Sequence, residues 1–427
     1  MKTKTALGLL FAVNLLNFFD RQLPGALGES IRKEFELNDT TLGLLGTVFT
    51  LMYAAVGLPV GRLADTWIRT RLISVGVAVW SGLTALSGLA SSFGMLAAAR
   101  LGVGIGEATC SPACQSLIGD LFPREKRSRA LGIFMLGLPL GLCLSYLVAG
   151  WIGQSYGWRA CFVIACVPGL VLALLVLRIR EPARGAADAH VAGSGPLSFS
   201  TSLAQLLRIR TLWWIIASGA LHNFNIYAIN AFQTPFLLRF HELSLREASG
   251  VSAISLGAVG AIGLLLGGWA SDKWSQRRPD ARLLLATFTM LAAVPCVFLA
   301  LAQPRGNIVA FMIPMGLGTA FSFVYYATVY AAIQDVVQPR LRGTAVALYF
   351  FAMYVLGASL GPLITGMLSD HFAHSAMVAA GAAEMSPVFR ATGLHDAMYV
   401  IPALALLCAG VLFAASRTVT RDLIVKP

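Results

Sequence analysis

A chain of 427 residues of which 57% are hydrophobic and only 12% charged is too apolar for a soluble globular protein, in which about 25% of residues are charged. The mean hydropathy of +0.73 indicates an integral membrane protein. The net charge of +12 does not indicate nucleic-acid binding, because most of the basic residues lie in the loops predicted to face the inner side of the membrane.

Twelve apolar stretches are long enough to span a bilayer as α-helices, which requires about 20 residues. They cover residues 6–27, 41–61, 71–90, 94–118, 130–153, 160–178, 212–236, 248–269, 282–302, 307–332, 344–367 and 396–416. The first is not a cleaved signal peptide, because it is long, carries Asp20 and Arg21 and lacks a small-residue cleavage site. The sequence therefore predicts an all-α integral membrane protein, with a long outer loop at 368–395.

Ionisable side chains lie inside the first and fourth spans. Asp20 and Arg21 are near the outer end of span 1. Arg100 and Glu107 are seven residues apart in span 4 and therefore share one helix face. Such groups are costly in a membrane, so they generally pair, face a wet cavity and act on ions or substrates. The alternative is a static pair that only sets helix packing.

Two patterns in the inward-facing loops occur twice, 207 and 216 residues apart. The first is Gly61-Arg-Leu-Ala-Asp65 and Gly268-Trp-Ala-Ser-Asp272, and the second begins at Pro123-Arg124 and at Pro339-Arg340. This duplication predicts two six-helix bundles, 1–182 and 211–427, joined by a small and polar linker at 183–210. With both termini inside, 23 of the 32 Lys and Arg residues face inward and 7 lie in outward loops, which predicts cytoplasmic termini.

The C-terminal half carries neutral polar groups where the N-terminal half carries charges. The candidates are Asn223, Tyr227 and Asn230 in span 7, and Tyr326 and Tyr330 in span 10. Their spacing of three or four residues places each set on one helix face. Such faces suit a polar head group beside an apolar chain, and the alternative is hydrogen bonding between helices. His222 is either a second proton site or a hydrogen-bonded packing residue.

Nothing in the sequence indicates an enzyme or a bound cofactor. There is no phosphate-binding Gly-x-x-x-x-Gly-Lys-Ser/Thr run and no nucleophile–base constellation. The seven cysteines all lie within predicted spans and show no metal-ligand spacing. We therefore expect no catalytic residues, no metal and no cofactor, and an ion gradient as the source of energy.

The duplicated loops resemble the signature of the major facilitator superfamily over the whole chain. The first copy departs from it, with Thr66, Ile68 and Thr70 in place of Arg, Gly and Lys. Three further segments resemble the Spinster-type lysolipid transporters: Asn17-Phe-Phe-Asp20-Arg21, Gly104-Ile-Gly-Glu107-Ala and the run from Phe122 to Phe134. Sugar-acid and aromatic-acid symporters share the Asp-Arg pair in helix 1 and remain alternatives.

The resemblance implies twelve transmembrane helices in two pseudo-symmetric bundles, with helices 1, 4, 7 and 10 lining a central cavity. At about 1.5 Å per residue, Asp20 and Arg100 lie at similar depth, so we expect them to pair, with Glu107 near the midplane. We assign proton coupling to Asp20, Arg100 and Glu107. Substrate binding is assigned to Arg21, Arg100, Asn223, Tyr227, Asn230, Tyr326 and Tyr330, and gating to Asp65, Arg69, Arg129, Asp272 and Arg342.

The predicted function is proton-coupled transport of an amphiphilic anion, such as a lysolipid or a sphingolipid-like molecule, by alternating access. A proton-coupled organic-acid symporter is the main alternative, and a non-transporting membrane sensor is the alternative of a different class. We expect a monomer in the cell's inner (plasma) membrane, in contact with membrane lipids and with no nucleic-acid partner.

Overall fold

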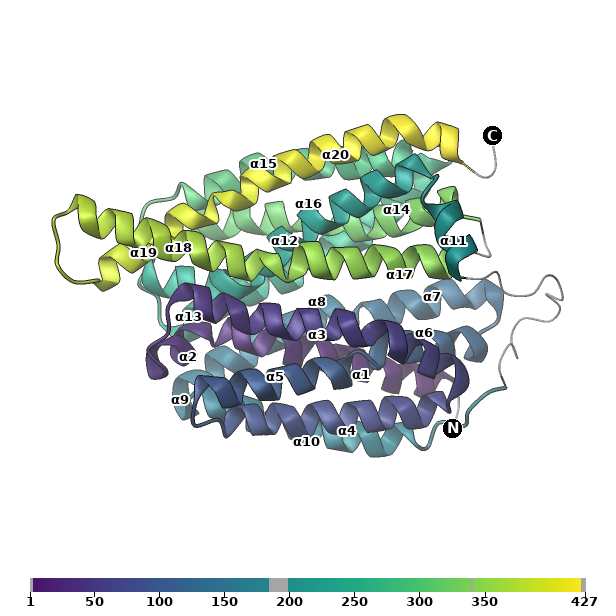
Figure 1. The fold of residues 1–427 in the computed structure, drawn as a ribbon, viewed down its shortest axis with the longest axis horizontal. Coiled ribbons are helices and arrows are strands. Elements are labelled where there is room, and N and C mark those ends of the chain that lie inside the picture. The colour runs from purple at the N-terminus through teal and green to yellow at the C-terminus, as the bar shows by residue number, and fades with distance from the viewer. Residues whose placement is uncertain (1–2, 184–198, 339–340, 424–427) are drawn as a thin grey trace. The chain divides into compact units, whose positions relative to one another are not determined.

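The structure, a computed structural model, describes residues 3–183, 199–338 and 341–423, and these ranges are helical almost throughout (Figure 1). The helices before residue 184 are α1 (Thr3–Ala26), α2 (Gly28–Glu34), α3 (Asp39–Thr66), α4 (Arg69–Gly88), α5 (Phe93–Glu107), α6 (Cys110–Leu121), α7 (Arg124–Met135), α8 (Gly137–Val148), the π-helix η1 (Ala149–Gly153), α9 (Gln154–Tyr156) and α10 (Trp158–Val176). Those after residue 198 are α11 (Phe199–Leu206), α12 (Arg210–Arg239), α13 (Leu245–Ser252), the π-helix η2 (Ala253–Ala258), α14 (Val259–Ser275), α15 (Ala281–Leu301), α16 (Ile308–Val336), α17 (Arg342–Ala352), the π-helix η4 (Met353–Ala358), α18 (Leu360–Ala379), α19 (Pro387–Met398) and α20 (Val400–Asp422). The predicted all-α class is confirmed.

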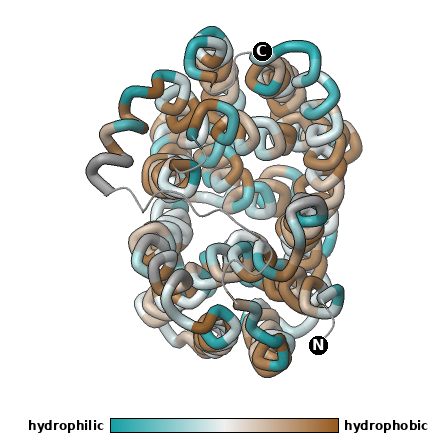
Figure 2. Tube along the Cα trace, turned by 90° about the vertical axis from the view of Figure 1, so that its right-hand side faces the viewer, coloured by the Kyte–Doolittle hydropathy of each residue, from teal (hydrophilic) through white to brown (hydrophobic). Residues whose placement is uncertain are grey.

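Each of the twelve predicted spans corresponds, to within a few residues at its ends, to one helix or a run of consecutive helices. Among the described residues, nine helices or runs are long and apolar enough to cross a membrane. The predicted spans outside those nine correspond to α1, the α5–α6 run and α12. Each of these three segments carries a buried ionisable residue: Asp20 in α1, Glu107 at the end of α5 and His222 in α12. Figure 2 shows the helices end-on, with hydrophobic residues along much of their length.

The described chain forms two compact units that do not coincide with the predicted halves. Unit 1 comprises residues 3–37, 48–183 and 245–253, and unit 2 comprises 38–47, 199–244, 254–338 and 341–423. The first turns of α3 therefore pack within unit 2, and α13 packs within unit 1. Of the predicted linker, residues 184–198 lie outside the described residues, and α11 follows them.

In both units, glycine residues allow two helices to come into direct backbone contact. In unit 1, a Cβ added to Gly141 of α8 would lie 2.4 Å from the Leu15 carbonyl oxygen of α1. In unit 2, a Cβ added to Gly361 of α18 would lie 2.3 Å from the Phe224 carbonyl oxygen of α12. Only glycine allows backbones to approach this closely. The two helix pairs α1–α8 and α12–α18 therefore meet backbone to backbone at these glycines.

The predicted outer loop at 368–395 is wrong. Helix α18 continues to Ala379, and α19 begins at Pro387 after an N-cap in which the Ser386 hydroxyl accepts from the Phe389 N–H at 3.4 Å. His371, His374 and Ser375 lie on the exposed face of this helix, while Ser369 and Ala373 on the opposite face are buried. The polar residues of this segment therefore mark one face of the helix and not its end.

Candidate functional site

Four ionisable side chains gather inside unit 1, two from α1 and two from α5. Asp20 and Glu107 are fully buried, and Arg100 is 1% exposed. The Arg21 side chain is 8% exposed. Two acids and two bases thus share a site with almost no access to solvent, where charges are stable only when they are paired or hydrogen-bonded.

The ion pair of this cluster joins Arg21 to Glu107. The Arg21 Nη2 and Nε atoms donate to Glu107 Oε2 at 3.1 and 3.2 Å. Arg21 Nη2 also lies 3.4 Å from the side-chain oxygen of Asn17. Glu107 Oε1 is buried with no hydrogen-bond partner among the described residues. The residue predicted to be a free proton carrier is therefore held on one side by a cation from α1.

Asp20 and Arg100, which we expected to pair, are close enough for their charges to interact but form no ion pair among the described residues. Both Asp20 carboxylate oxygens and Arg100 Nη1 are buried without a hydrogen-bond partner in the described part of the chain. The prediction compared depths by backbone rise alone. Side chains on a helix lean toward its N-terminus, and spans 1 and 4 run in opposite directions. Arg21 and Glu107 therefore lean toward each other and close a gap of roughly 10 Å in backbone depth.

Aromatic rings of α3 support both arginines. The Arg100 guanidinium carbon lies 5.1 Å from the centre of the Phe49 ring, and that of Arg21 lies 4.5 Å from the centre of the Tyr53 ring. Cation–π contacts at these distances stabilise a cation that has lost its water. The sequence analysis missed these rings, although their spacing of four residues places them on one helix face.

Glycines position Glu107 against its neighbours. A Cβ on Gly104 would lie 2.9 Å from the Phe49 carbonyl oxygen, and one on Gly106 would lie 2.9 Å from the Trp80 Cβ. Helix α5 therefore packs directly on α3 and α4. It ends at Glu107, where the Thr109 hydroxyl donates to the Gly106 carbonyl at 2.8 Å. The Gly-x-Gly-Glu pattern thus fixes the carboxylate at a helix end beside the charged cluster.

A second polar cluster lies inside unit 2, between α12 and α16. The Asn223 amide donates to the Gly219 carbonyl at 2.9 Å, and the Tyr326 hydroxyl lies 3.4 Å from Asn223 Oδ1. The Tyr326 and Tyr330 rings are 5.9 Å apart. The structure therefore brings three of the predicted substrate residues together. Asn230 is half-buried farther along α12.

Helix α17 and η4 extend this cluster with residues that the sequence analysis missed. The Tyr325 hydroxyl bonds to the hydroxyls of Ser218 and Tyr349 at 2.9 and 3.2 Å. Tyr354 meets the predicted Tyr227 edge-on, with ring centres 6.4 Å apart. These residues are far apart in sequence, so only the fold reveals that they are neighbours. The result is a packed cluster of rings in which the hydroxyls of Tyr325, Tyr349 and Ser218 are buried and hydrogen-bonded to one another.

His222 is a stacking partner in this cluster. Its ring lies 4.0 Å from the Tyr325 ring, nearly parallel, and 5.0 Å from the Tyr326 ring. The side chain is 1% exposed, and Nε2 has no hydrogen-bond partner among the described residues. These ring contacts favour the packing alternative over a proton site. The hydrogen bond expected of a packing histidine is absent at Nε2 among the described residues.

Arg69, one of the predicted gating residues, is fully engaged inside unit 1. Its guanidinium pairs with Asp120 and donates to Glu181 at 2.8 Å. Burial alone would raise the pKa of Glu181, but hydrogen bonds from Arg69 and Thr70 outweigh it and hold that pKa below the usual value. These bonds tie the start of α4 to the end of α6 and to the segment after α10.

Unit 2 repeats this ion pair at the equivalent place. Arg282, in the first turn of α15, pairs with Asp335 near the end of α16 at 2.7 Å. Arg69 and Asp120 hold the corresponding positions in α4 and α6. The internal duplication is therefore present in specific contacts as well as in the loop sequences.

The other predicted gating residues have looser surroundings. Arg342 donates to the carbonyls of Gln334 and Val337 at 2.8 and 3.3 Å, at the end of α16. Arg129 and Asp272 are exposed, and neither makes an ion pair within the described ranges. The side chain of Asp65 lies outside the described residues. A gating role for these positions stays a prediction.

Comparison with known proteins identifies the family. The family model of the Major Facilitator Superfamily matches residues 10–362. A curated "MFS-type efflux pump" of Mycolicibacterium smegmatis is 34% identical over 372 residues, which are 86% of this chain and 84% of the relative. The zebrafish (Danio rerio) "Sphingosine-1-phosphate transporter SPNS2" is 28% identical over 390 residues, 87% of this chain and 77% of the relative.

A solved structure gives the same result at the level of the fold. The crystal structure of a bacterial homologue of the human lysosomal transporter Spinster matches with a TM-score of 0.89 and 30% identity, over 100% of this chain and 99% of that chain. These relatives are transporters, in agreement with the prediction that the chain is not an enzyme. The chain belongs to the major facilitator superfamily and is a multi-pass membrane transporter of the Spinster type.

Proposed function

We propose that the chain moves an amphiphilic anion, such as a lysolipid or a sphingolipid-like molecule, in exchange for or together with protons by alternating access. One observation carries the proton coupling: the fully buried Asp20 carboxylate has no hydrogen-bond partner among the described residues, beside an Arg21–Glu107 pair. An ionised carboxylate in such a place is costly, and a bound proton removes the charge.

Asp20, Glu107 and Arg100 form the proposed coupling unit. Arg21 neutralises Glu107 through one oxygen and leaves the other oxygen open. When an anionic substrate draws Arg21 or Arg100 toward itself, the carboxylates lose part of their compensating charge and take up a proton. Loss of the substrate reverses this exchange. The carboxylates and the anionic substrate therefore compete for the same guanidinium groups, and protons bind to the carboxylates that lose this compensating charge.

The substrate class follows from the chemistry of the two clusters. Guanidinium groups bind phosphate and carboxylate well, so Arg21 and Arg100 suit an anionic head group. Asn223, Tyr227, Asn230, Tyr326 and Tyr330 add hydrogen bonds beside apolar ring surface, which suits the body of an amphiphile. The relative named as a sphingosine-1-phosphate transporter moves a molecule of this kind, and the relative named as an efflux pump favours export.

We also propose the energy source, the membrane orientation and the gate of this transporter. The proton gradient drives transport without a bound cofactor, and the chain works as a monomer in the inner (plasma) membrane with cytoplasmic termini. The excess of basic residues in the inward loops supports this orientation. Asp65, Arg69, Arg129, Asp272 and Arg342 act at the cytoplasmic gate.

Flux measurements in proteoliposomes with an imposed pH gradient test this function. Wild-type protein, Glu107→Gln and the matched control Glu384→Gln, an exposed carboxyl in an outer loop, are offered labelled lysolipids and sugar acids. We expect gradient-driven lysolipid flux in the wild type and the control, and its loss in folded Glu107→Gln. Normal coupled flux in Glu107→Gln would refute the proposal. Flux of sugar acids alone favours the organic-acid symporter, and no flux of any substrate favours a sensor.

A further inference from the structure

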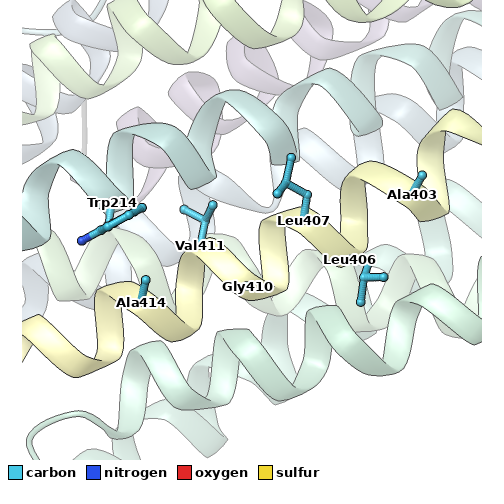
Figure 3. A pocket seen from close by; sticks show the side chains of 7 residues that line it. All are labelled: Trp214, Ala403, Leu406, Leu407, Gly410, Val411 and Ala414. Atoms are coloured by element: carbon cyan, nitrogen blue, oxygen red, sulfur yellow. The ribbon is translucent and has the colours of Figure 1, made fainter.

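A groove runs between α12 and α20 on the face of unit 2 that is exposed to lipid. It is lined by Trp214, Ala403, Leu406, Leu407, Gly410, Val411 and Ala414 (Figure 3). Leu406 and Leu407 are 53% and 54% exposed. Three of the lining residues are Ala or Gly, so the groove is a shallow depression between larger apolar side chains.

The groove is open rather than filled by the protein's own packing. A Cβ added to Gly410, midway along it, would meet no atom within 4 Å. Helix α20 packs into unit 2 through its opposite face, where Cys408 and Leu412 are fully buried. The exposed face carrying Gly410 is therefore free to take a ligand without a change in the helix contacts.

Positive charge lies at one end of this groove. The lining positions of α20 follow the stripe 403, 407, 410 and 414, and the same spacing continues to Arg417 and Arg421. On α12, Arg210 lies one turn before Trp214 on the same face. In Figure 3, Trp214 lies at the Ala414 end of the groove. Arg417 and Arg421 follow Ala414 along α20 and therefore belong to this end.

No ion pair to these arginines is present in the described part of the chain. Arg210, Arg417 and Arg421 are exposed. The neighbouring Asp422 uses its Oδ2 atom to cap α12, accepting from the Thr211 N–H at 2.8 Å and from the Thr211 hydroxyl at 2.7 Å. This end of α12 and α20 therefore carries three exposed arginines, of which Arg417 has its guanidinium carbon 5.7 Å from the centre of the Phe413 ring.

We propose that this groove binds one anionic phospholipid, with an acyl chain along α20 and its phosphate head group on the three arginines. An aliphatic chain matches the apolar lining, and the anionic head group matches the unpaired charge. The Trp214 indole lies at the junction between the two, where tryptophans are favoured in membranes. The positive-inside bias predicts this end to be cytoplasmic, where the leaflet is rich in anionic lipids.

The site is separate from the buried clusters proposed for transport. Arginine substitutions here change the exposed end of unit 2 and touch neither the Arg21–Glu107 pair nor the tyrosine cluster. An ordinary shell of lipid would show no preference between head groups, whereas this site discriminates by charge. Measured lipid affinities distinguish an ordinary lipid shell from a charge-selective site. In a charge-selective site, each exposed arginine near the membrane surface changes the affinity for an anionic lipid about fivefold.

Native mass spectrometry of the full-length protein, titrated with phosphatidylglycerol or phosphatidylcholine, tests the site. We expect one phosphatidylglycerol to be retained in preference to phosphatidylcholine. The double variant Arg417→Gln/Arg421→Gln should bind phosphatidylglycerol about 25-fold more weakly. Equal retention of the two lipids by the wild type, or unchanged retention by the double variant, would overturn the proposal.

A steric variant tests the acyl-chain part independently of charge. Gly410→Phe fills the groove, and Gly82→Phe is its matched control, because Gly82 is an exposed glycine of α4 with equally open space around an added Cβ. We expect Gly410→Phe, and not Gly82→Phe, to lower phosphatidylglycerol retention at unchanged thermal unfolding in detergent. If only the arginine variants lower retention, the lipid binds by its head group alone and the groove is not its site.

Discussion

Removing Arg21 tests how the buried charges of unit 1 depend on one another. Arg21→Gln leaves Glu107, which is fully buried, without the two hydrogen bonds at 3.1 and 3.2 Å that hold its Oε2 atom. Breaking a buried ion pair by deleting one partner costs about 3–5 kcal/mol. At about 2–4 °C per kcal/mol for a unit of this size, the apparent melting temperature should fall on the order of 10 °C.

The reverse substitution should cost less. In Glu107→Gln, Arg21 keeps its contacts with Asn17 and with the Tyr53 ring, and its side chain is 8% exposed. In the double variant no uncompensated charge remains, so we expect most of the stability lost in Arg21→Gln to return. The destabilisation of Arg21→Gln should also shrink at acid pH, since a proton then neutralises Glu107.

Thermal unfolding in detergent, followed by tryptophan fluorescence at pH 8 and pH 5, measures this cycle. Arg277→Gln, an exposed arginine in a loop of unit 2, is the matched control and should leave the melting temperature unchanged. If Arg21→Gln melts with the wild type at both pH values, or if the double variant is no more stable than Arg21→Gln, the pair does not hold Glu107 in the way described.

Two other predictions concern packing and pH. Gly141→Ala should lower the melting temperature, because the added Cβ has no room against α1. Gly8→Ala is the control and should leave the melting temperature unchanged, because a Cβ at Gly8 would meet no atom within 4 Å. Equal effects of the two substitutions would contradict the close helix contact. Burial, and then the charge of His395, lowers the pKa of His241 in the loop after α12 from 6.5 to about 4. The folded chain then binds fewer protons than the unfolded chain between these values, so stability should fall by up to about 3 kcal/mol as pH drops from 6.5 to 4. His241→Asn, which keeps an acceptor for the Gly306 N–H, should flatten this part of the stability–pH curve, and an unchanged curve would show that another group titrates there.

The spans were predictable because a membrane leaves an apolar stretch of about 20 residues little choice but a helix. The continuation of a helix beyond its apolar stretch was not predictable. Helix α18 extends to Ala379 with polar residues on its exposed face, and hydropathy alone does not distinguish this from a loop. The assignment of residues 38–47 to unit 2 was equally hidden, because it depends on contacts distant in sequence.

The residue types of the charged cluster were predictable, and their pairing was not. Sequence spacing correctly placed Arg100 and Glu107 in one helix and Asp20 and Arg21 in another. The partner of Glu107 depended on the direction in which long side chains lean from antiparallel helices, which a comparison of depths along the axes omits. The rings of α3 that support the arginines required the fold itself.

Proton movement driven by substrate, in the absence of any imposed pH difference, tests most directly whether the buried carboxylates couple the two. Wild-type protein in liposomes that enclose a pH-sensitive dye should change the internal pH when a lysolipid gradient is applied. Asp20→Asn and Glu107→Gln should abolish this pH change while lysolipid exchange at equal concentrations persists. An unaltered pH change in both variants would show that the proton travels by another route and that the buried cluster serves packing alone.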